Sequence, residues 1–414
     1  MAGCGVARRP LAPPPAQTTL HFLVGAPAKR AAPANPANSY GSVKRLLGRP
    51  YRALPRPELA RLGFGVVEAF DGGAGLWCPA RGEALTPVDV CGVLLASLAS
   101  RAAEAAGGPL GGAVVTVPAR FTPPQLAAVR AAAAAAGLGD DVRLLHEPVA
   151  AAIAHGVGRV VEQADGSRPP PSDDVALVVD LGGGTLDVAI VDAFEGMLEV
   201  VGAAGDASLG GDDWDAALAD WLATQHPVAA ALAAAGGRAP GARVRLLAAA
   251  EAAKVALSAA DGADAELRLV DGAPPVRVAL SRARFDSLTA HLTARLWPVL
   301  ERAAAEAGVA LVAGPEGPRA APPPSTDRFA PAPRTVTRVI LVGGGTRVPA
   351  VAALVEAAAG VAPETGVDPE AAVALGAAAL AGALAGRGGA FELGDGSYAP
   401  DLHGRSSGFG AAEK

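Results

Sequence analysis

The sequence predicts an α/β fold made of two lobes that face a common ligand. Segments typical of strands alternate with segments typical of helices, which indicates sheets layered with helices. Two glycine-bracketed loops, at residues 182–184 and 343–345, occur in distant parts of the chain. With 414 residues, of which 51% are hydrophobic, the chain is long enough for two lobes, each with its own core.

Composition excludes several classes of protein. The formal net charge is −6 and no basic stripe is interleaved with aromatic residues, so we expect no nucleic-acid binding. Cys4, Cys78 and Cys91 fit neither a disulfide framework nor metal-ligand spacing, and they indicate a reducing compartment. The alanine-rich segments are broken by charges, so we expect no membrane span.

Residues 1–40 contain no Asp or Glu but carry Arg8, Arg9, Lys29 and Arg30. Such a start is typical of an organelle transit peptide, which predicts a mitochondrial or plastid location in a eukaryote. The alternative is a proline-rich disordered tail over residues 1–18 of a protein that is otherwise cytoplasmic.

The first half of the chain predicts alternating elements. A short strand is expected at residues 19–25. A helix is expected at 86–107, with Thr86 as its cap and Pro87 in its first turn. A buried strand then ends at Pro118. The next helix starts after Thr122 and ends near residue 137, and "DVRLLHEPVAAAIAHG" predicts a strand that leads into a helix.

The second half continues the pattern. "VALVVDLGGGTLDVAIVDA" predicts two strands joined by a tight turn, and the following residues predict a strand, a glycine pair and a helix. The later segments are an amphipathic helix at 243–260, a hairpin at 266–281, a long helix or helix pair at 282–309, a low-complexity loop at 314–333, a strand, turn and helix at 337–360, a last helix at 368–386 and a disordered tail at 387–414.

The turn "DLGGGTLD" carries the first chemical signal. It is neither a P-loop nor a dinucleotide-binding loop, because it leads into a second strand. A glycine hairpin can surround a phosphate with backbone N–H groups. Asp180 and Asp187 flank the glycines, and Thr185 lies between them. Carboxylates beside a phosphate require a cation such as Mg²⁺. The alternative is a plain β-turn with surface acids.

Three further segments strengthen the hypothesis of a nucleotide site. The glycines at 343–345 lie between a strand and a helix N-terminus, where a nucleotide can bind. Another pair, at 210–211, precedes a third helix. Glu251, Lys254 and Ser258 are spaced i, i+3 and i+7, which places them on one helical face. The alternative for these three residues is a solvated ion pair.

In this order the motifs resemble the ATPase domain of the seventy-kilodalton heat-shock chaperone family, which has the actin-like (ribonuclease H-like) ATPase fold. The similarity runs from about Leu20 to Gly386. The strings that carry it include "VVTVPARF", "LLHEPVAAAIAHG", "VVDLGGGTLDVAI", "GDASLGGDDWD", "EAAKVALS", "VILVGGGTRVP" and "DPEAAVALGAA". "VGAPAKRAAPANPANS" is similar to the bacterial and organellar, DnaK-like members.

The resemblance implies ATP or ADP with Mg²⁺, and K⁺ as a further candidate ion. It implies that Lys44 holds the γ-phosphate and the attacking water, that Glu147 and Asp180 lie near water and metal, and that Thr185 contacts the γ-phosphate. Asp180 and Asp187 are the implied metal-site residues. The residues implied to bind nucleotide are Gly182, Gly183, Gly184, Gly210, Gly211, Glu251, Lys254, Ser258, Gly343, Gly344, Arg347 and Glu370. Pro118 matches the family's switch proline.

The implied domain organisation is two lobes around a nucleotide cleft. Lobe I would span residues 19–172 and lobe II residues 173–365, with an insertion at 314–333. A helix at 366–386 would return to lobe I. A J-domain co-chaperone and a nucleotide-exchange factor are the implied partners.

Three departures from the family pattern affect this hypothesis. The family's first glycine hairpin is not found before Leu20, so we expect the first strands of lobe I to be missing. No β-rich domain follows Gly386, so we expect no direct client-peptide site. Leu126 stands where the family carries an arginine. We therefore expect an ATP-binding, slowly hydrolysing chaperone domain; the alternative is a catalytically impaired regulator or partner-binding module of the same fold.

Overall fold

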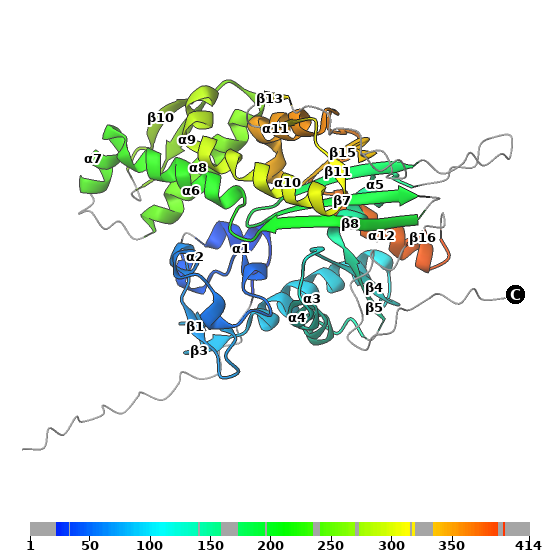
Figure 1. Cartoon of the computed structure of the whole chain (residues 1–414). Helices are drawn as coiled ribbons and strands as arrows, with labels where there is room; N and C mark the ends of the chain where they lie inside the picture. The colour runs from blue at the N-terminus through cyan, green and yellow to red at the C-terminus, as the bar shows by residue number, and fades with distance from the viewer. Residues whose placement is uncertain are drawn as a thin grey trace, which may run out of the picture.

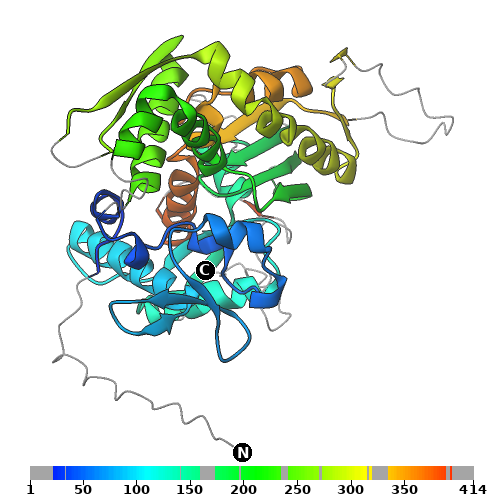
Figure 2. The ribbon, with the colours of Figure 1, turned by 90° about the vertical axis from the view of Figure 1, so that its left-hand side faces the viewer.

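A computed structural model of the chain shows two lobes that lie one above the other (Figure 1). A view turned by 90° shows the same separation, with the first part of the chain in one lobe and the middle part in the other (Figure 2). The structure describes residues 22–32, 34–139, 141–158, 173–194, 197–234, 241–269, 273–314, 317–318, 334–387 and 392–393.

A five-stranded mixed sheet forms the centre of the upper lobe. Its order is β15 (Arg338–Val342), β6 (Asp174–Leu181), β7 (Leu186–Phe194), β8 (Met197–Asp206) and β16 (Glu392–Leu393). The central strand β7 is antiparallel to both β6 and β8, whereas β15 is parallel to β6 and β16 is parallel to β8. The near-continuous apolar run of β6 fits its place in the middle, where helices cover both faces.

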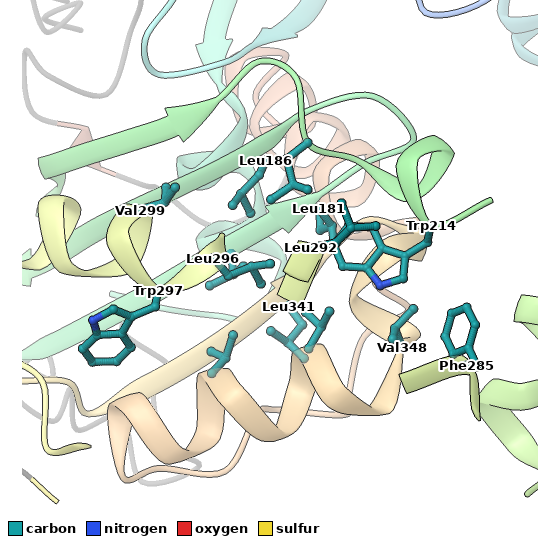
Figure 3. Packing of buried hydrophobic residues seen from close by; sticks show 14 of the residues in the cluster. Leu181, Leu186, Trp214, Phe285, Leu292, Leu296, Trp297, Val299, Leu341 and Val348 are labelled. Atoms are coloured by element: carbon teal, nitrogen blue, oxygen red, sulfur yellow. The ribbon is translucent and has the colours of Figure 1, made fainter. Parts of the chain in front are cut away.

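Helices α6 (Gly211–Thr224), α8 (Ala242–Ala259), α9 (Arg282–Ala294), α10 (Leu296–Glu306) and α11 (Pro349–Ala359) belong to the core on one side of this sheet. Figure 3 shows Trp214 and Leu296 in that core near Leu181 and Leu186 of the sheet, with Phe285 farther out beside Val348. The upper lobe also contains α7 (His226–Ala234) and the hairpin of β9 (Gly262–Leu267) and β10 (Val276–Ser281).

Two helices cover the other side of the sheet. Side chains of α5 (Glu147–Ala154) and α12 (Ala372–Leu384) share a core cluster with β6, β7, β8 and β15. The two helices approach so closely that a Cβ on Gly376 would lie 1.7 Å from the carbonyl oxygen of Ala150. Helix α12 also contacts β4 (Ala113–Val117), which pairs in parallel with β5 (Val142–His146). These helices therefore connect the sheet of the upper lobe to the lower lobe.

The lower lobe contains shorter elements and two long helices. Its helix α3 (Pro87–Ala106) starts with a capping box between Thr86 and Asp89 and ends at Gly107, whose φ is 73°. Helix α4 (Pro123–Ala135) packs Leu126 into the core at 2% exposure. The remaining elements are α1 (Ala26–Ala31), α2 (Arg56–Arg61), the sheet of β1 (Val66–Glu68), β2 (Ala74–Cys78) and β3 (Glu83–Leu85), and the 3₁₀ turns η1 (Pro36–Asn38), η2 (Val43–Arg45) and η3 (Tyr51–Ala53).

Several sequence-based expectations meet a different local structure. Residues 22–25 form no strand, and helix α1 follows them. By contrast, the segment at 282–309, expected to be a long helix or a helix pair, is a pair that is broken at Arg295. Within the segment expected to be a tail, residues 392 and 393 form β16. The predicted tail at 1–18, residues 19–21 of the predicted first strand, most of the predicted tail at 387–414 and most of the predicted insertion at 314–333 lie outside the described residues.

Short pieces complete the fold: β11 (Val309–Ala310), β12 (Ala313–Gly314), β13 (Gly317–Pro318), β14 (Arg334–Thr335) and η4 (Gly344–Arg347). A search of the described helices finds none with both the length and the apolar character that crossing a bilayer requires.

Candidate functional site

The glycine hairpin joins β6 to β7, as the sequence predicts. Gly182 N–H donates to the carbonyl oxygen of Thr185 at 3.0 Å, which closes the turn. The N-terminus of α6 holds the hairpin from the side: Gly211 N–H donates to Gly182 O at 2.9 Å, and Asp212 N–H donates to Gly183 O at 2.8 Å. A Cβ on Gly210 would lie 2.5 Å from Gly183 O, so this approach requires glycine. Two loops that are separate in the sequence thus form one surface.

Three carboxylates and one lysine gather beside the hairpin. Asp180 and Asp187 are directly paired across β6 and β7. Glu147, the first residue of α5, approaches from the lower lobe, and Lys44 Nζ donates to its two carboxylate oxygens at 2.8 and 3.0 Å. Glu147, Asp180, Asp187 and Arg120 line a small cavity of about 10 Å³, which is near the lower limit for holding one water molecule.

Burial and mutual repulsion disturb the protonation of these groups. Burial, followed by the charge of Glu147, raises the pKa of Asp180 to about 7. The same two causes raise the pKa of Asp187 to about 6, against the opposing effect of Lys44. Burial alone would lower the pKa of Lys44, but the surrounding carboxylates, Glu147 foremost, raise it. The repulsion among these carboxylates therefore favours the binding of a cation. Without one, it favours protonation of an aspartate.

Helix α8 carries Glu251, Lys254 and Ser258, the helical face predicted to bind nucleotide, and places it beside the start of α6. Lys254 Nζ lies 2.8 Å from Asp215 Oδ1 and donates to Gly211 O at 3.1 Å, so it ties α8 to the start of α6. Ser258 Oγ donates to Lys254 O at 3.3 Å. Glu251 pairs with Lys29 of the lower lobe at 2.5 Å. The three predicted residues share one face of α8, and Lys254 on this face contacts the start of α6, which in turn bonds to the glycine hairpin.

The second glycine loop lies against the end of β6, because β15 pairs in parallel with β6 and Val342 is opposite Asp180. Gly343 has a φ of 81°, and a Cβ there would lie 2.5 Å from Leu181 O. Beyond the loop, Arg347 Nη2 lies 2.7 Å from Asp368 Oδ1, and Arg347 Nε lies 3.7 Å from Glu370 Oε2. The fold therefore places both glycine loops at one sheet edge.

Sequence reasoning missed several charged groups in this region. Ser42 Oγ donates to Asp212 Oδ2 at 2.9 Å, which joins the two lobes. Arg45 is buried beside Gly184, and Asp215 is the carboxylate partner of Lys254. The neighbours Lys44–Arg45 and the run "GDDWD" were the available signals, but their side-chain directions depend on tertiary packing.

The residues present fit a nucleotide with Mg²⁺. No group of three or more His, Cys, Asp or Glu side chains that could hold a metal occurs within the described ranges. Mg²⁺ commonly uses one or two carboxylates together with water and substrate phosphates, and the pair Asp180–Asp187 suits that mode. Residues 182–184 are glycines, so no side chain of the hairpin itself stands between its backbone N–H groups and a phosphate.

Paired strand-end aspartates, a glycine hairpin and a second glycine loop between two α/β lobes define the class of actin-like ATPase folds. A family model described as "Hsp70 protein" matches residues 16–312 and 331–396. This chain belongs to the Hsp70 family.

Curated relatives agree with this assignment. The chain is 35% identical over 345 residues to "Chaperone protein DnaK" of Trichormus variabilis, which covers 82% of this chain and 45% of the relative. It is 38% identical over 330 residues to "Chaperone protein HscA" of Serratia proteamaculans, covering 79% and 45%. It is 37% identical over 339 residues to "Chaperone protein HscA homolog" of Azotobacter vinelandii, again covering 79% and 45%. The chain thus spans less than half the length of these relatives.

Proposed function

We propose that this chain binds ATP with Mg²⁺ between its lobes and hydrolyses it slowly, as the nucleotide-binding part of a heat-shock-type chaperone. The observation that carries the proposal is the contact between Lys44 and Glu147 beside the paired aspartates of the glycine hairpin. Family membership supports the same nucleotide and ion.

Each side chain has a separate task in the proposed reaction. The backbone N–H groups and the Thr185 hydroxyl hold the terminal phosphate, while Glu147 and Asp180 orient a water molecule for in-line attack. Lys44, fixed by Glu147, places its positive charge where negative charge develops. Glu251, Lys254, Ser258, Arg347 and Glu370 hold the nucleoside. When bound, Mg²⁺ neutralises phosphate charge and is held near Asp180 and Asp187.

Calorimetric titration with Mg-ATP tests binding, and release of phosphate in single-turnover experiments tests hydrolysis. We expect Asp180→Asn to weaken binding and Thr185→Val to slow turnover by about a hundredfold. Thr224→Val is the matched control, because Thr224 lies on the exposed end of α6 and donates only to Trp221 O. Absence of binding at millimolar Mg-ATP would contradict the proposal.

A second candidate function is that of a catalytically impaired regulator of the same fold. It is favoured by Leu126, which is buried in the core of α4 and supplies no charge to relay a signal from the nucleotide. In that case Mg-ATP binds but no turnover above background occurs.

We further propose a J-domain co-chaperone and a nucleotide-exchange factor as partners. Stimulation of turnover by a J-domain protein is the corresponding measurement.

A further inference from the structure

Arg45 is a buried cation whose hydrogen-bond donors are not all satisfied. Its side chain is only 10% exposed, and its Nε and Nη2 atoms have no hydrogen-bond partner. Guanidinium stays protonated in proteins, so the positive charge is present at every relevant pH. A buried donor without a partner is unusual enough to need an explanation.

The nearest carboxylate compensates this charge only in part. Arg45 Nη2 lies 3.8 Å from Asp213 Oδ2, which is beyond hydrogen-bond distance. That oxygen already accepts a hydrogen bond from Gly210 N–H at 2.8 Å, at the N-terminus of α6. Asp212 also feels the charge of Arg45, but its carboxylate accepts a hydrogen bond from Ser42. Both acids are therefore committed to other groups.

The position of Arg45 connects it to the hairpin. It follows Lys44 in the turn η2 of the lower lobe, and its guanidinium packs against Gly184 of the upper lobe. A Cβ on Gly184 would lie 2.6 Å from Arg45 Nε. The glycine at 184 thus makes room for a cation directly against the hairpin, while Lys44 approaches Glu147.

We propose that Arg45 is an electrostatic positioning residue for the phosphate chain. Its buried charge packs against the glycine hairpin and attracts the nucleotide in proportion to the number of phosphate charges. A fixed cation in a site of low dielectric acts over several ångströms without a direct hydrogen bond, and it needs no reorganisation when the ligand arrives. This inference rests on the proposed function, because it assigns a role within that same site.

The test compares the affinities of Mg-ATP, Mg-ADP and AMP in the full chain. In Arg45→Met we expect the affinity for Mg-ATP to fall by about tenfold or more, and that for Mg-ADP by less. The affinity for AMP should stay within about twofold. Arg45→Lys keeps the charge and should recover most of the loss. Thermal melting of each variant checks that it is folded.

Asp213→Asn is the matched control. Asparagine keeps an oxygen that can accept from Gly210 N–H, but it removes the counter-charge of Arg45. If the field of Arg45 attracts phosphates, this change tightens Mg-ATP binding, which is opposite in sign to Arg45→Met. If Arg45 and Asp213 form only a structural ion pair, both variants weaken binding alike, and the inference is wrong.

Three other outcomes also overturn the inference: an equal loss of affinity for all three nucleotides in Arg45→Met, no change in any of them, or no recovery in Arg45→Lys. A wild-type chain that does not bind Mg-ATP contradicts the proposed function itself, and this inference fails with it. A wild-type chain that binds Mg-ATP while Arg45→Met changes nothing contradicts only the role of Arg45.

Discussion

Lys44 and Glu147 are separated by 103 residues, yet Lys44 Nζ contacts both carboxylate oxygens of Glu147. Lys44 comes from a short 3₁₀ turn and Glu147 from the first turn of α5. Since the two residues are far apart in the sequence, their contact forms only when folding brings η2 and α5 together.

Replacing Lys44 by Met should lower ATP turnover by about a hundredfold or more, because the proposed site loses the positive charge that Glu147 holds in place. Single-turnover phosphate release measures the effect. Arg52→Met is the control: Arg52 also pairs with a carboxylate, Glu68, at 3.0 Å, but its side chain is 84% exposed. Equal loss in the two variants would show that the effect is not specific to the site.

The metal-free, nucleotide-free chain should become less stable as the pH rises from 5 to 8, as far as Asp180 and Asp187 are concerned. Their folded-state pKa values of about 7 and about 6 lie above the ordinary value of an aspartate, so the folded state binds more protons than the unfolded state in this range. The stabilisation is complete below the unfolded-state pKa and is lost as pH rises through the folded values.

The measurement is thermal melting against pH for wild type and Asp180→Asn. The variant cannot ionise at this position, so its melting temperature should fall less steeply between pH 5 and 8. The difference should correspond to a few kcal/mol at most, at about 1.4 kcal/mol for each pKa unit. Identical slopes in the two proteins would contradict the assigned coupling.

Gly376→Ala should prevent normal packing of α12 on α5. The new methyl group would lie 1.7 Å from Ala150 O. The nearest atoms all belong to the Ala150 backbone, so they cannot turn away. We expect a loss of about 3 kcal/mol or more in the free energy of unfolding. Chemical denaturation measures it, and Gly366→Ala is the control because a Cβ there meets no atom within 4 Å.

Trp214→Phe should change the stability by no more than about 1 kcal/mol. The indole is fully buried, but its Nε1–H has no partner, so the exchange removes an unsatisfied donor along with some packing. Trp214→Ala should cost about 3–5 kcal/mol, because it leaves a cavity in the core. If Trp214→Phe lowered the free energy of unfolding in urea as much as Trp214→Ala, the indole N–H would have to make a stabilising hydrogen bond, and the prediction would be wrong.

Local patterns in the sequence were sufficient for the elements whose signals are local. The capped helices α3 and α4, the hairpin of β6 and β7, and the hairpin of β9 and β10 were all predicted from caps, glycines and alternation. The sequence predicted that the two glycine loops face a common ligand, and the pairing of β15 with β6 brings both loops to the same end of the sheet.

Other features could not be predicted because they depend on distant partners. Residues 22–25 have strand-like composition, but a strand requires a neighbouring edge, which local sequence does not specify. The pairing of residues 392–393 with the edge of β8 is of the same kind. The burial of Arg45 against Gly184 depends on the contact between two lobes, and no spacing in the sequence encodes it.

The residues of the proposed site are distributed over both lobes. The upper lobe contains both glycine loops and both paired aspartates, whereas the lower lobe contributes Lys44, Arg45 and Glu147. A fragment of either lobe would therefore carry half of the proposed chemistry. The proposed hydrolysis would therefore require that both lobes be present and in contact.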